Sequence, residues 1–183
     1  MQKINIKIMN TPLGEMIAGV TASGVHLLEF FNPDRIEKQK HRLLKKSNVI
    51  FSDEPHRIHE QLQAELEQYF AGKRTEFAVH TIPTGTEFQI KVWRNLQKIR
   101  FGQTVSYQEL SNSMGAPNAI RAVAGANGEN PIAILIPCHR VIGKDGNLTG
   151  YGGGLDRKRK LLNLERQTSS SEIYRKGDQI DLF

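Results

Sequence analysis

The sequence is poor in the features that mark disulfide scaffolds, metal-binding modules and membrane proteins. It contains one cysteine in 183 residues, which excludes an intramolecular disulfide and a cysteine-rich metal site. No run of about 18 apolar residues occurs, so no membrane span is expected. The N-terminus lacks the unbroken apolar stretch of a signal peptide. We therefore expect a cytoplasmic protein in a reducing compartment.

The composition is that of a globular chain with a small excess of positive charge. Hydrophobic residues make up 38% of the chain and charged residues 24%, which is enough for a packed core. The net charge of +6 favours a polyanionic partner such as nucleic acid. Many proteins that bind no nucleic acid are also mildly basic, so charge alone does not identify the partner.

The first third of the chain predicts a small α/β unit. Period-two alternation and turn signals indicate strands, and apolar residues at helical spacing indicate helices. The predicted elements are three strands followed by two helices, over residues 4–9, 16–20, 25–31, 34–46 and 58–70. Because short turns join the strands, we expect an antiparallel sheet.

A stretch without clear period, residues 74–86, separates this unit from the rest of the chain. We place the domain boundary there, with a first domain over 1–84 and a second over 85–167. The polar, serine-rich residues 168–183 predict a loose tail. The histidines of the first domain show no metal-like spacing with carboxylates, so no metal site is expected.

The second domain predicts a pair of short helices joined by a glycine turn. Ser106, followed three residues later by Glu109, forms a capping box that starts the first helix. Pro117 suits the first turn of the second helix, which is expected to run to Asn127. Helix pairs of this kind bind DNA in many proteins, but many helical hairpins bind nothing.

The second of these helices is unusually smooth, because Arg121 is its only charged residue among alanines and a glycine. Small side chains let a backbone approach DNA closely, and a single arginine can fill the space of a base that has been flipped out of the duplex. The plainer alternative is an alanine-rich helix packed against a neighbour, with Arg121 in a salt bridge.

The single cysteine, Cys138, follows an apolar run over residues 131–136 that predicts a buried strand ending at Pro137. His139 comes next, so a thiol and an imidazole are expected at the tip of the strand. A free thiol has a pKa of roughly 8.5 and needs a base or a positive field to become a nucleophile. The alternative is a buried cysteine that acts as a small hydrophobic side chain.

Taken together, these motifs resemble one family, the O(6)-alkylguanine-DNA alkyltransferases, also called methylated-DNA–protein-cysteine methyltransferases. The segments that carry the resemblance are residues 88–93, 105–107, 121–131, 134–143, 150–155 and 161–165. They cover essentially the whole of the second domain. The resemblance implies an α+β protein with a ribonuclease-H-like N-terminal α/β domain that contains an antiparallel sheet. It also implies a mostly helical, winged helix-turn-helix C-terminal domain.

The same resemblance implies the roles of the reactive residues. Cys138 is the acceptor that takes the alkyl group from the O(6) atom of guanine, and His139 is its base, acting through a water. Glu165 orients the imidazole, and Asn130 ties the helix pair to the thiol segment. Tyr107 donates a proton to the leaving guanine. Because no second cysteine is present to regenerate the thiol, each molecule is expected to act once.

The expected partner is double-stranded DNA, bound through its minor groove with the alkylated base flipped out, by a monomer that needs no cofactor, metal or membrane. The resemblance makes Arg121 the side chain that enters the base stack. The other expected DNA contacts are Tyr107, Gln108, Ala119, Ala122, Gly125 and Lys144. The expected pocket residues are Pro137, Val141, Tyr151 and Gly152. Some family members carry serine at the position of Gly152, which would change the hydrogen bonding of the pocket.

Three other classes of protein share parts of this pattern. A non-enzymatic protein that binds alkylated lesions would lack the acceptor cysteine, whereas Cys138 is present. A winged-helix regulator would need more side chains that reach base edges, and it leaves the thiol unexplained. A cysteine hydrolase usually takes its histidine from a distant part of the sequence.

Overall fold

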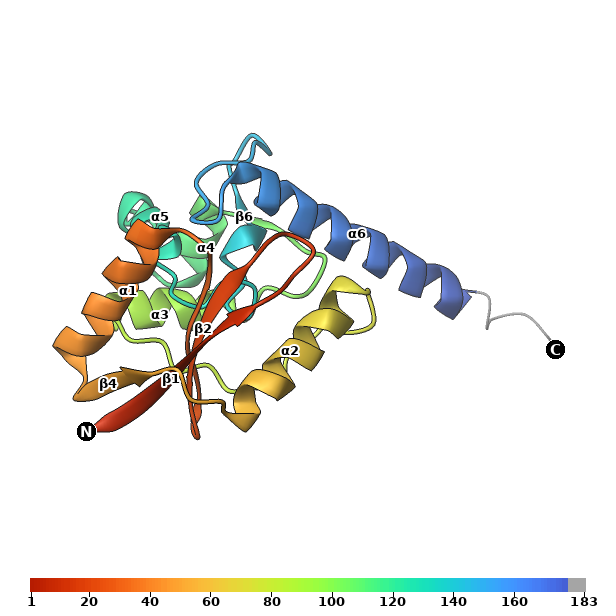
Figure 1. Ribbon diagram of the computed structural model, residues 1–183. Helices are drawn as coiled ribbons and strands as arrows, with labels where there is room; N and C mark the ends of the chain where they lie inside the picture. Colours follow the sequence, from red (N-terminus) through yellow and green to blue (C-terminus); the bar gives the residue numbers. More distant parts are fainter. Residues whose placement is uncertain (178–183) are drawn as a thin grey trace.

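A four-stranded sheet lies in the first third of the computed structural model, which describes the backbone of residues 1–177 and the side chains of residues 1–170 (Figure 1). Its strands are β1 (Gln2–Met9), β2 (Met16–Thr21), β3 (Gly24–Phe30) and β4 (Val49–Ser52), in the order β3-β2-β1-β4. Strands β1 to β3 form the predicted antiparallel arrangement. Strand β4 pairs with β1 in parallel. It is missing from the predicted elements because four residues are too few to show a clear period.

Helices cover both faces of this sheet. Helix α1 (Pro33–Lys46) packs Ile36 and Leu43 in a small cluster with Ile17 of β2. Helix α2 (Arg57–Phe70) packs in the main core with Met16, the residue before Ile17. Because neighbouring residues of a strand point to opposite faces, the two helices lie on opposite sides of the sheet. Both helices were predicted from the sequence, with boundaries that differ by one residue at most.

Short helices and a small strand pair make up the second half of the chain. The elements are α3 (Glu87–Leu96), β5 (Val105–Ser106), α4 (Tyr107–Ser113), α5 (Ile120–Gly128), the 3-10 turn η1 (Cys138–Arg140), β6 (Val141–Ile142) and α6 (Leu155–Gly177). The predicted capping box is present, because the Ser106 side chain accepts from the Glu109 amide and Glu109 accepts from the Ser106 amide. The chain turns from α4 toward α5 at Gly115, whose φ of 69° is easily adopted only by glycine.

Residues 131–136 do not form the predicted strand. They make a single bridge to Leu28 of β3 and then curl, so that the Ile136 amide bonds to the Ile132 carbonyl. Ile134 adopts a φ of 70°, which is rare for a β-branched residue. The Asn130 side chain replaces a neighbouring strand, since it accepts from the Ile132 amide and donates to the Ile136 carbonyl. The apolar run therefore indicated burial correctly and extended structure wrongly.

Two other boundaries also differ from the prediction. Helix α5 begins at Ile120, so that Pro117 lies in the preceding turn and not in the helix. Helix α6 continues through residues 168–177, where a loose tail was expected; residues 178–183 of that tail lie outside the described part of the chain. Among residues 1–177, no helix combines the length and apolar content needed to cross a membrane.

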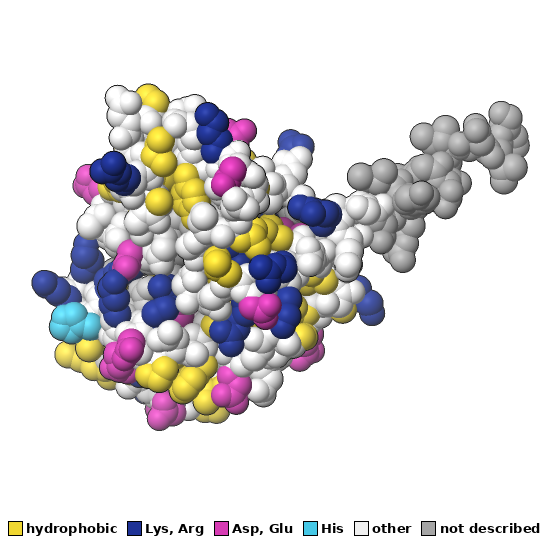
Figure 2. All heavy atoms as spheres, turned by 90° about the horizontal axis from the view of Figure 1, so that it is seen from above, with side chains coloured by type: hydrophobic (Ala, Val, Ile, Leu, Met, Phe, Trp, Pro, Cys, Tyr) yellow, Lys and Arg dark blue, Asp and Glu magenta, His cyan; other side chains and the backbone are white. Residues whose placement is uncertain are grey.

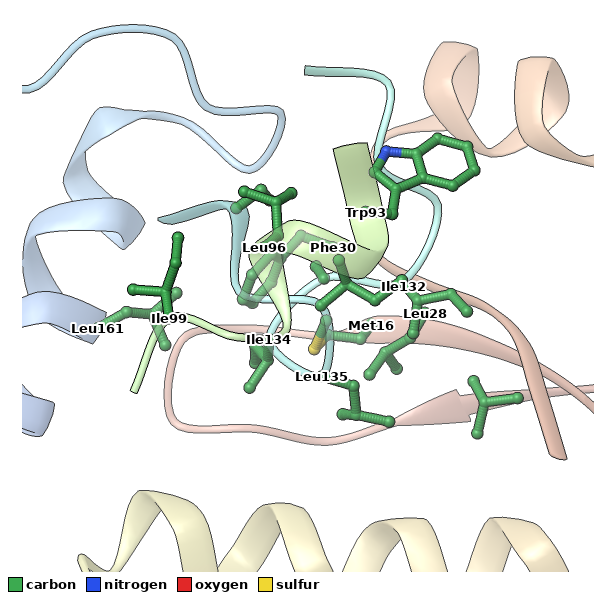
Figure 3. Packing of buried hydrophobic residues seen from close by; sticks show 14 of the residues in the cluster. Met16, Leu28, Phe30, Trp93, Leu96, Ile99, Ile132, Ile134, Leu135 and Leu161 are labelled. Atoms are coloured by element: carbon green, nitrogen blue, oxygen red, sulfur yellow. The ribbon is translucent and has the colours of Figure 1, made fainter. Parts of the chain in front are cut away.

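One continuous core joins the two halves of the chain. Figure 3 shows Met16 and Phe30 of the sheet close to Leu96 and Ile132 from beyond residue 85. The Trp93 indole, which is fully buried, donates to the Ala126 carbonyl at 2.8 Å and so fixes α3 against α5. The core contains residues from both sides of the predicted domain boundary between residues 84 and 85. The thiol segment is held between the sheet and the short helices.

Candidate active site

The thiol of Cys138 is buried in the turn η1, with 5% of the residue exposed. The Asn130 side-chain amide donates to Cys138 Sγ at 3.0 Å and to the Ile136 carbonyl at 2.8 Å. A single asparagine therefore shapes the chain on both sides of Pro137 and also contacts the sulfur. The side-chain hydrogen bonds of Asn130 all go to residues 132–138, so its expected link to the helix pair stays a prediction.

Burial makes the thiol of Cys138 a weak acid. It raises the pKa of Cys138 to about 11, although the hydrogen bond from Asn130 lowers it in part. At neutral pH the sulfur therefore keeps its proton in the free protein. Chemistry at this sulfur needs a group that removes the proton as the reaction proceeds.

The ring of His139, the residue after Cys138, is held in place by Glu165. Its Nε2 atom lies 2.8 Å from Oε1 of Glu165, and both side chains are fully buried. Because the carboxylate can only accept a hydrogen bond, Nε2 carries the proton and Nδ1 keeps its lone pair. The Nδ1 atom is buried and has no hydrogen-bond partner among the described residues. Burial lowers the pKa of His139 more than Glu165 raises it, so the ring is neutral and able to accept a proton.

The Glu165 carboxylate is held by far more than the histidine. It accepts five hydrogen bonds, from Tyr69 Oη, Gly102 N, His139 Nε2, and Arg140 Nε and Nη2. Burial raises the pKa of Glu165, but His139 and Arg140 lower it well below its usual range. The carboxylate is therefore ionised and fixed in one orientation.

A pocket of about 550 Å³ lies between α5 and the loop of residues 149–152. Its lining includes Tyr107, Arg121, Tyr151 and Gly152, all four of which were predicted site residues. Burial raises the pKa of Tyr107, and a negative charge on Cys138 would raise it further. Tyr107 is thus protonated at neutral pH and able to donate.

The remaining predicted pocket residues lie elsewhere. Pro137 lines a second cavity of about 770 Å³ on the side of residues 75–81, and Val141 is fully buried. Arg35 of α1 lines the 550 Å³ pocket instead. Its guanidinium bonds to Glu29 at 2.8 Å and to the Gly128 carbonyl at 3.2 Å. A side chain at Gly152 would meet the guanidinium carbon at 2.4 Å, so a serine there would require Arg35 to move.

The helix pair α4–α5 presents the residues that were predicted to contact DNA. Arg121, Ala122 and Gly125 are exposed on α5, Ala119 is half-buried at its start, and Gln108 is half-buried on α4. A Cβ added at Gly125 would meet no atom within 4 Å, which leaves this helix face smooth and open. The alternative placed Arg121 in a salt bridge, but Arg121 is exposed and none of the ion pairs among the described side chains involves it.

Basic side chains elsewhere on the surface are scattered. Lys144 is exposed in the loop after β6. Figure 2 shows the face that is uppermost in Figure 1, with Lys and Arg side chains spread over it and acidic side chains between them. Such a surface suits weak attraction to a phosphate backbone and not the reading of base sequence. The part of the chain that the structure describes contains no cluster of three or more potential metal ligands.

A buried lysine holds the loop that carries Tyr151. Lys158 of α6 is fully buried, and its Nζ donates to the carbonyls of Val141 and Thr149, each at 2.6 Å. Burial lowers the pKa of Lys158 to about 8, so the ammonium form still predominates at pH 7. The sequence gives no signal for this role, because a lysine in a basic helix normally lies at the surface.

Sequence reasoning also missed Tyr69, Arg140 and Arg35. Arg140 follows His139 directly, and that adjacency was the one signal available for it. Tyr69 lies 96 residues before Glu165 in an ordinary apolar helix pattern. Arg35 belongs to a polar helix that reads as a solvated face.

Fold and site together define a nucleophilic-cysteine protein with a helix pair of the type that binds nucleic acid. A family model described as the DNA-binding domain of 6-O-methylguanine DNA methyltransferase matches residues 87–167. The methylated-DNA–protein-cysteine methyltransferase of Methanosarcina barkeri is 42% identical over 158 residues, which cover 86% of this chain and 94% of that protein. The chain belongs to the methylated-DNA–protein-cysteine methyltransferase family.

Mycobacterial relatives match a shorter part of the chain more closely. The protein of the same name from Mycolicibacterium paratuberculosis is 58% identical over 109 residues, which span 60% of this chain and 66% of the relative, just under two thirds of its length. The solved structure of Mycobacterium tuberculosis O6-methylguanine methyltransferase has a TM-score of 0.74 at 38% identity and covers 90% of this chain and 94% of its own. A structure of Mycobacterium tuberculosis OGT in complex with DNA gives a TM-score of 0.75 at 38% identity, covering 91% of this chain and 94% of that one.

Proposed function

We propose that this protein repairs DNA by transferring an alkyl group from the O6 atom of guanine to its own Cys138. The observation that carries the proposal is the buried thiol of Cys138, contacted by Asn130 and followed by a histidine that Glu165 orients. Family membership supplies the substrate class, because the relatives are named for methylated DNA and a protein cysteine.

The proposed reaction is a single displacement. The Cys138 proton passes to Nδ1 of His139 through a bridging water, while the sulfur attacks the alkyl carbon. The S–C bond forms as the C–O bond breaks, and the electron pair of that bond leaves with guanine. The Tyr107 phenol gives the departing base a proton, which makes guanine a better leaving group. The products are an S-alkylcysteine and an unmodified guanine.

Access to the target oxygen requires the base to leave the duplex. We propose that α5 lies in the minor groove, that Arg121 fills the vacated stack and that the flipped base enters the pocket beside Tyr151. The exposed small residues of α5 and the position of Arg121 at the pocket rim support this arrangement. In fold terms, α4, α5 and the β5–β6 pair make a winged helix-turn-helix, and the N-terminal sheet makes a ribonuclease-H-like unit. The protein acts as a monomer.

The proposal is tested by intact-protein mass spectrometry after mixing with a duplex that contains O6-methylguanine. We expect each protein molecule to gain one methylene unit in mass. With the duplex in excess, the amount of repaired DNA should equal the amount of protein and then stop. Repeated turnover would contradict the one-time reaction. Unchanged mass with tight lesion binding would instead identify a non-enzymatic lesion-binding protein.

An Arg121→Ala variant is expected to slow transfer from duplex DNA by about 10- to 100-fold, because a flipped base costs a few kcal/mol to hold without a side chain in its place. Transfer from the free O6-methylguanine base should be nearly unchanged. Arg94→Ala is the matched control, since Arg94 is an exposed arginine on α3 outside this pocket. Equal losses on duplex and free base would contradict the proposed role of Arg121.

A further inference from the structure

One buried tyrosine reaches the Glu165 carboxylate from the opposite half of the chain. Tyr69 lies near the end of α2 and is fully buried. Its hydroxyl donates to Oε1 of Glu165 at 2.7 Å, across 96 residues of sequence. The ring is fixed by Phe70 and Phe101, with ring centroids 5.3 and 6.0 Å away in edge-on contacts. The hydroxyl therefore has little freedom to leave the carboxylate.

Tyr69 and His139 share the same oxygen atom. Oε1 of Glu165 accepts from Tyr69 at 2.7 Å and from His139 at 2.8 Å, and Arg140 Nη2 adds a third donor at 2.9 Å. Each donor withdraws electron density from the oxygen, so the others bind to a weaker acceptor. A carboxylate that is stabilised in this way has less tendency to hold a proton on the imidazole.

We infer that Tyr69 is a positioning residue, which acts through Glu165 to keep His139 neutral and able to take the thiol proton. Its consequence for alkyl transfer rests on the function proposed above. The hydroxyl also fixes the carboxylate orientation that selects the Nε2–H tautomer of His139. In this way α2, from the half of the chain that carries no reactive residue, contributes to the base.

The other groups that face His139 act in both directions. Glu165 of α6 favours the protonated ring, whereas Arg140 of η1 and Lys158 of α6 disfavour it. Cys138 is the adjacent residue, and the Tyr151 ring lies edge-on with its centroid 6.5 Å from that of the imidazole. Burial is the largest influence and lowers the pKa of His139. Loss of the Tyr69 hydroxyl strengthens the one group that favours protonation, so the pKa of His139 should rise.

The test is a Tyr69→Phe variant, which removes one oxygen and keeps the aromatic contacts. NMR titration of the His139 ring should show a higher pKa than in the wild-type protein. The acid limb of the pH–rate profile for alkyl transfer should move to higher pH. At a pH on the acid limb, we divide the transfer rate of each protein by its own plateau rate at high pH. We expect this ratio to be about threefold lower for Tyr69→Phe than for the wild type.

Leu62→Val is the matched control, since Leu62 is a fully buried residue of α2 in the same core. The Leu62→Val substitution should lower the free energy of unfolding without moving the pH–rate profile, because Leu62 makes none of the hydrogen bonds to Glu165. An unchanged profile and an unchanged titration in Tyr69→Phe would overturn the inference even if the wild type transfers the alkyl group. If the wild type transfers nothing, the proposed function fails, while the titration still tests the inference.

A measurement on the wild-type protein keeps the inference testable if Tyr69→Phe does not fold. A hydroxyl that donates to a buried carboxylate exchanges slowly with water, so its proton should be visible by NMR, close in space to the Nε2 proton of His139. The absence of such a resonance would overturn the inference.

Discussion

A Cys138→Ser variant is expected to bind O6-methylguanine duplex and to leave the methyl group on the DNA. Serine preserves the size of the side chain and the hydrogen bond from Asn130. Its hydroxyl is a far weaker acid and nucleophile than the thiol, and burial weakens it further. Transfer should fall by about 10⁶-fold, the scale of loss when an enzyme is deprived of its nucleophile. Single-turnover assays with a labelled methyl group measure this loss.

The same variant separates binding from chemistry. Affinity for the methylated duplex should stay within about threefold of the wild type, because the proposed DNA contacts lie on α5 and around the pocket. Peptide mapping of the wild-type product provides the positive control and should place the methyl group on the peptide that contains Cys138. Methylation of Cys138→Ser at another residue would show that the acceptor has been assigned wrongly.

Glu165→Gln is expected to cause the second-largest loss, in stability as well as in transfer. The substitution removes the charge that accepts from Arg140 and replaces one acceptor oxygen by a donor NH₂ group that faces existing donors. Breaking a buried ion pair on one side costs about 3–5 kcal/mol. Transfer should also fall by about 100-fold or more, because His139 then faces an uncharged amide, whose one oxygen is a weaker acceptor and whose NH₂ group opposes the Nε2–H tautomer.

Denaturant unfolding and single-turnover transfer measure the two losses. Glu129→Gln is the matched control, since that glutamate is partly exposed and pairs with Lys38 and Arg42 at the surface; its loss should be within about 1 kcal/mol. Folding lowers the pKa of Glu165, so its stabilising contribution is complete above about pH 4.3 and disappears as the pH falls toward the folded pKa. The stability difference between wild type and Glu165→Gln should therefore narrow in acid. A constant difference across pH would contradict the role of the charge.

Local signals predicted the parts of the fold that depend on local physics. The capping box at Ser106 formed where it was expected because its two hydrogen bonds lie within three residues. The antiparallel strands β1 to β3 followed from alternation and tight turns. Residues 131–136 were predicted wrongly because a buried strand and a buried irregular segment have the same apolar pattern. The Asn130 side chain stabilises the irregular conformation by bonding to the backbone of Ile132 and Ile136.

The site could be predicted to the extent that its residues are close in sequence or belong to a recognised motif. Cys138 and His139 were identified from the apolar run that precedes them, and Glu165 came from the family resemblance; the structure places His139 and Glu165 in contact. Tyr69 and Lys158 could not be predicted, because the sequence does not show the hydrogen-bond partners of their buried polar atoms. The partner of Tyr69 is Glu165, far away in the chain, and the partners of Lys158 are backbone carbonyls. A sequence shows the apolar part of such a side chain and not the acceptor that it meets.

The continuous core that joins the two halves bears on how the thiol site could be moved or trimmed. The segment that the family model matches, residues 87–167, contains Tyr107, Cys138, His139 and Glu165. It nevertheless takes one donor to Glu165 from α2 and one wall of the pocket from Arg35 of α1. An engineer who transplanted residues 87–167 alone would keep the proposed acceptor thiol of Cys138. The transplant would lose the Tyr69 hydrogen bond to Glu165 and the Arg35 side chain that lines the pocket.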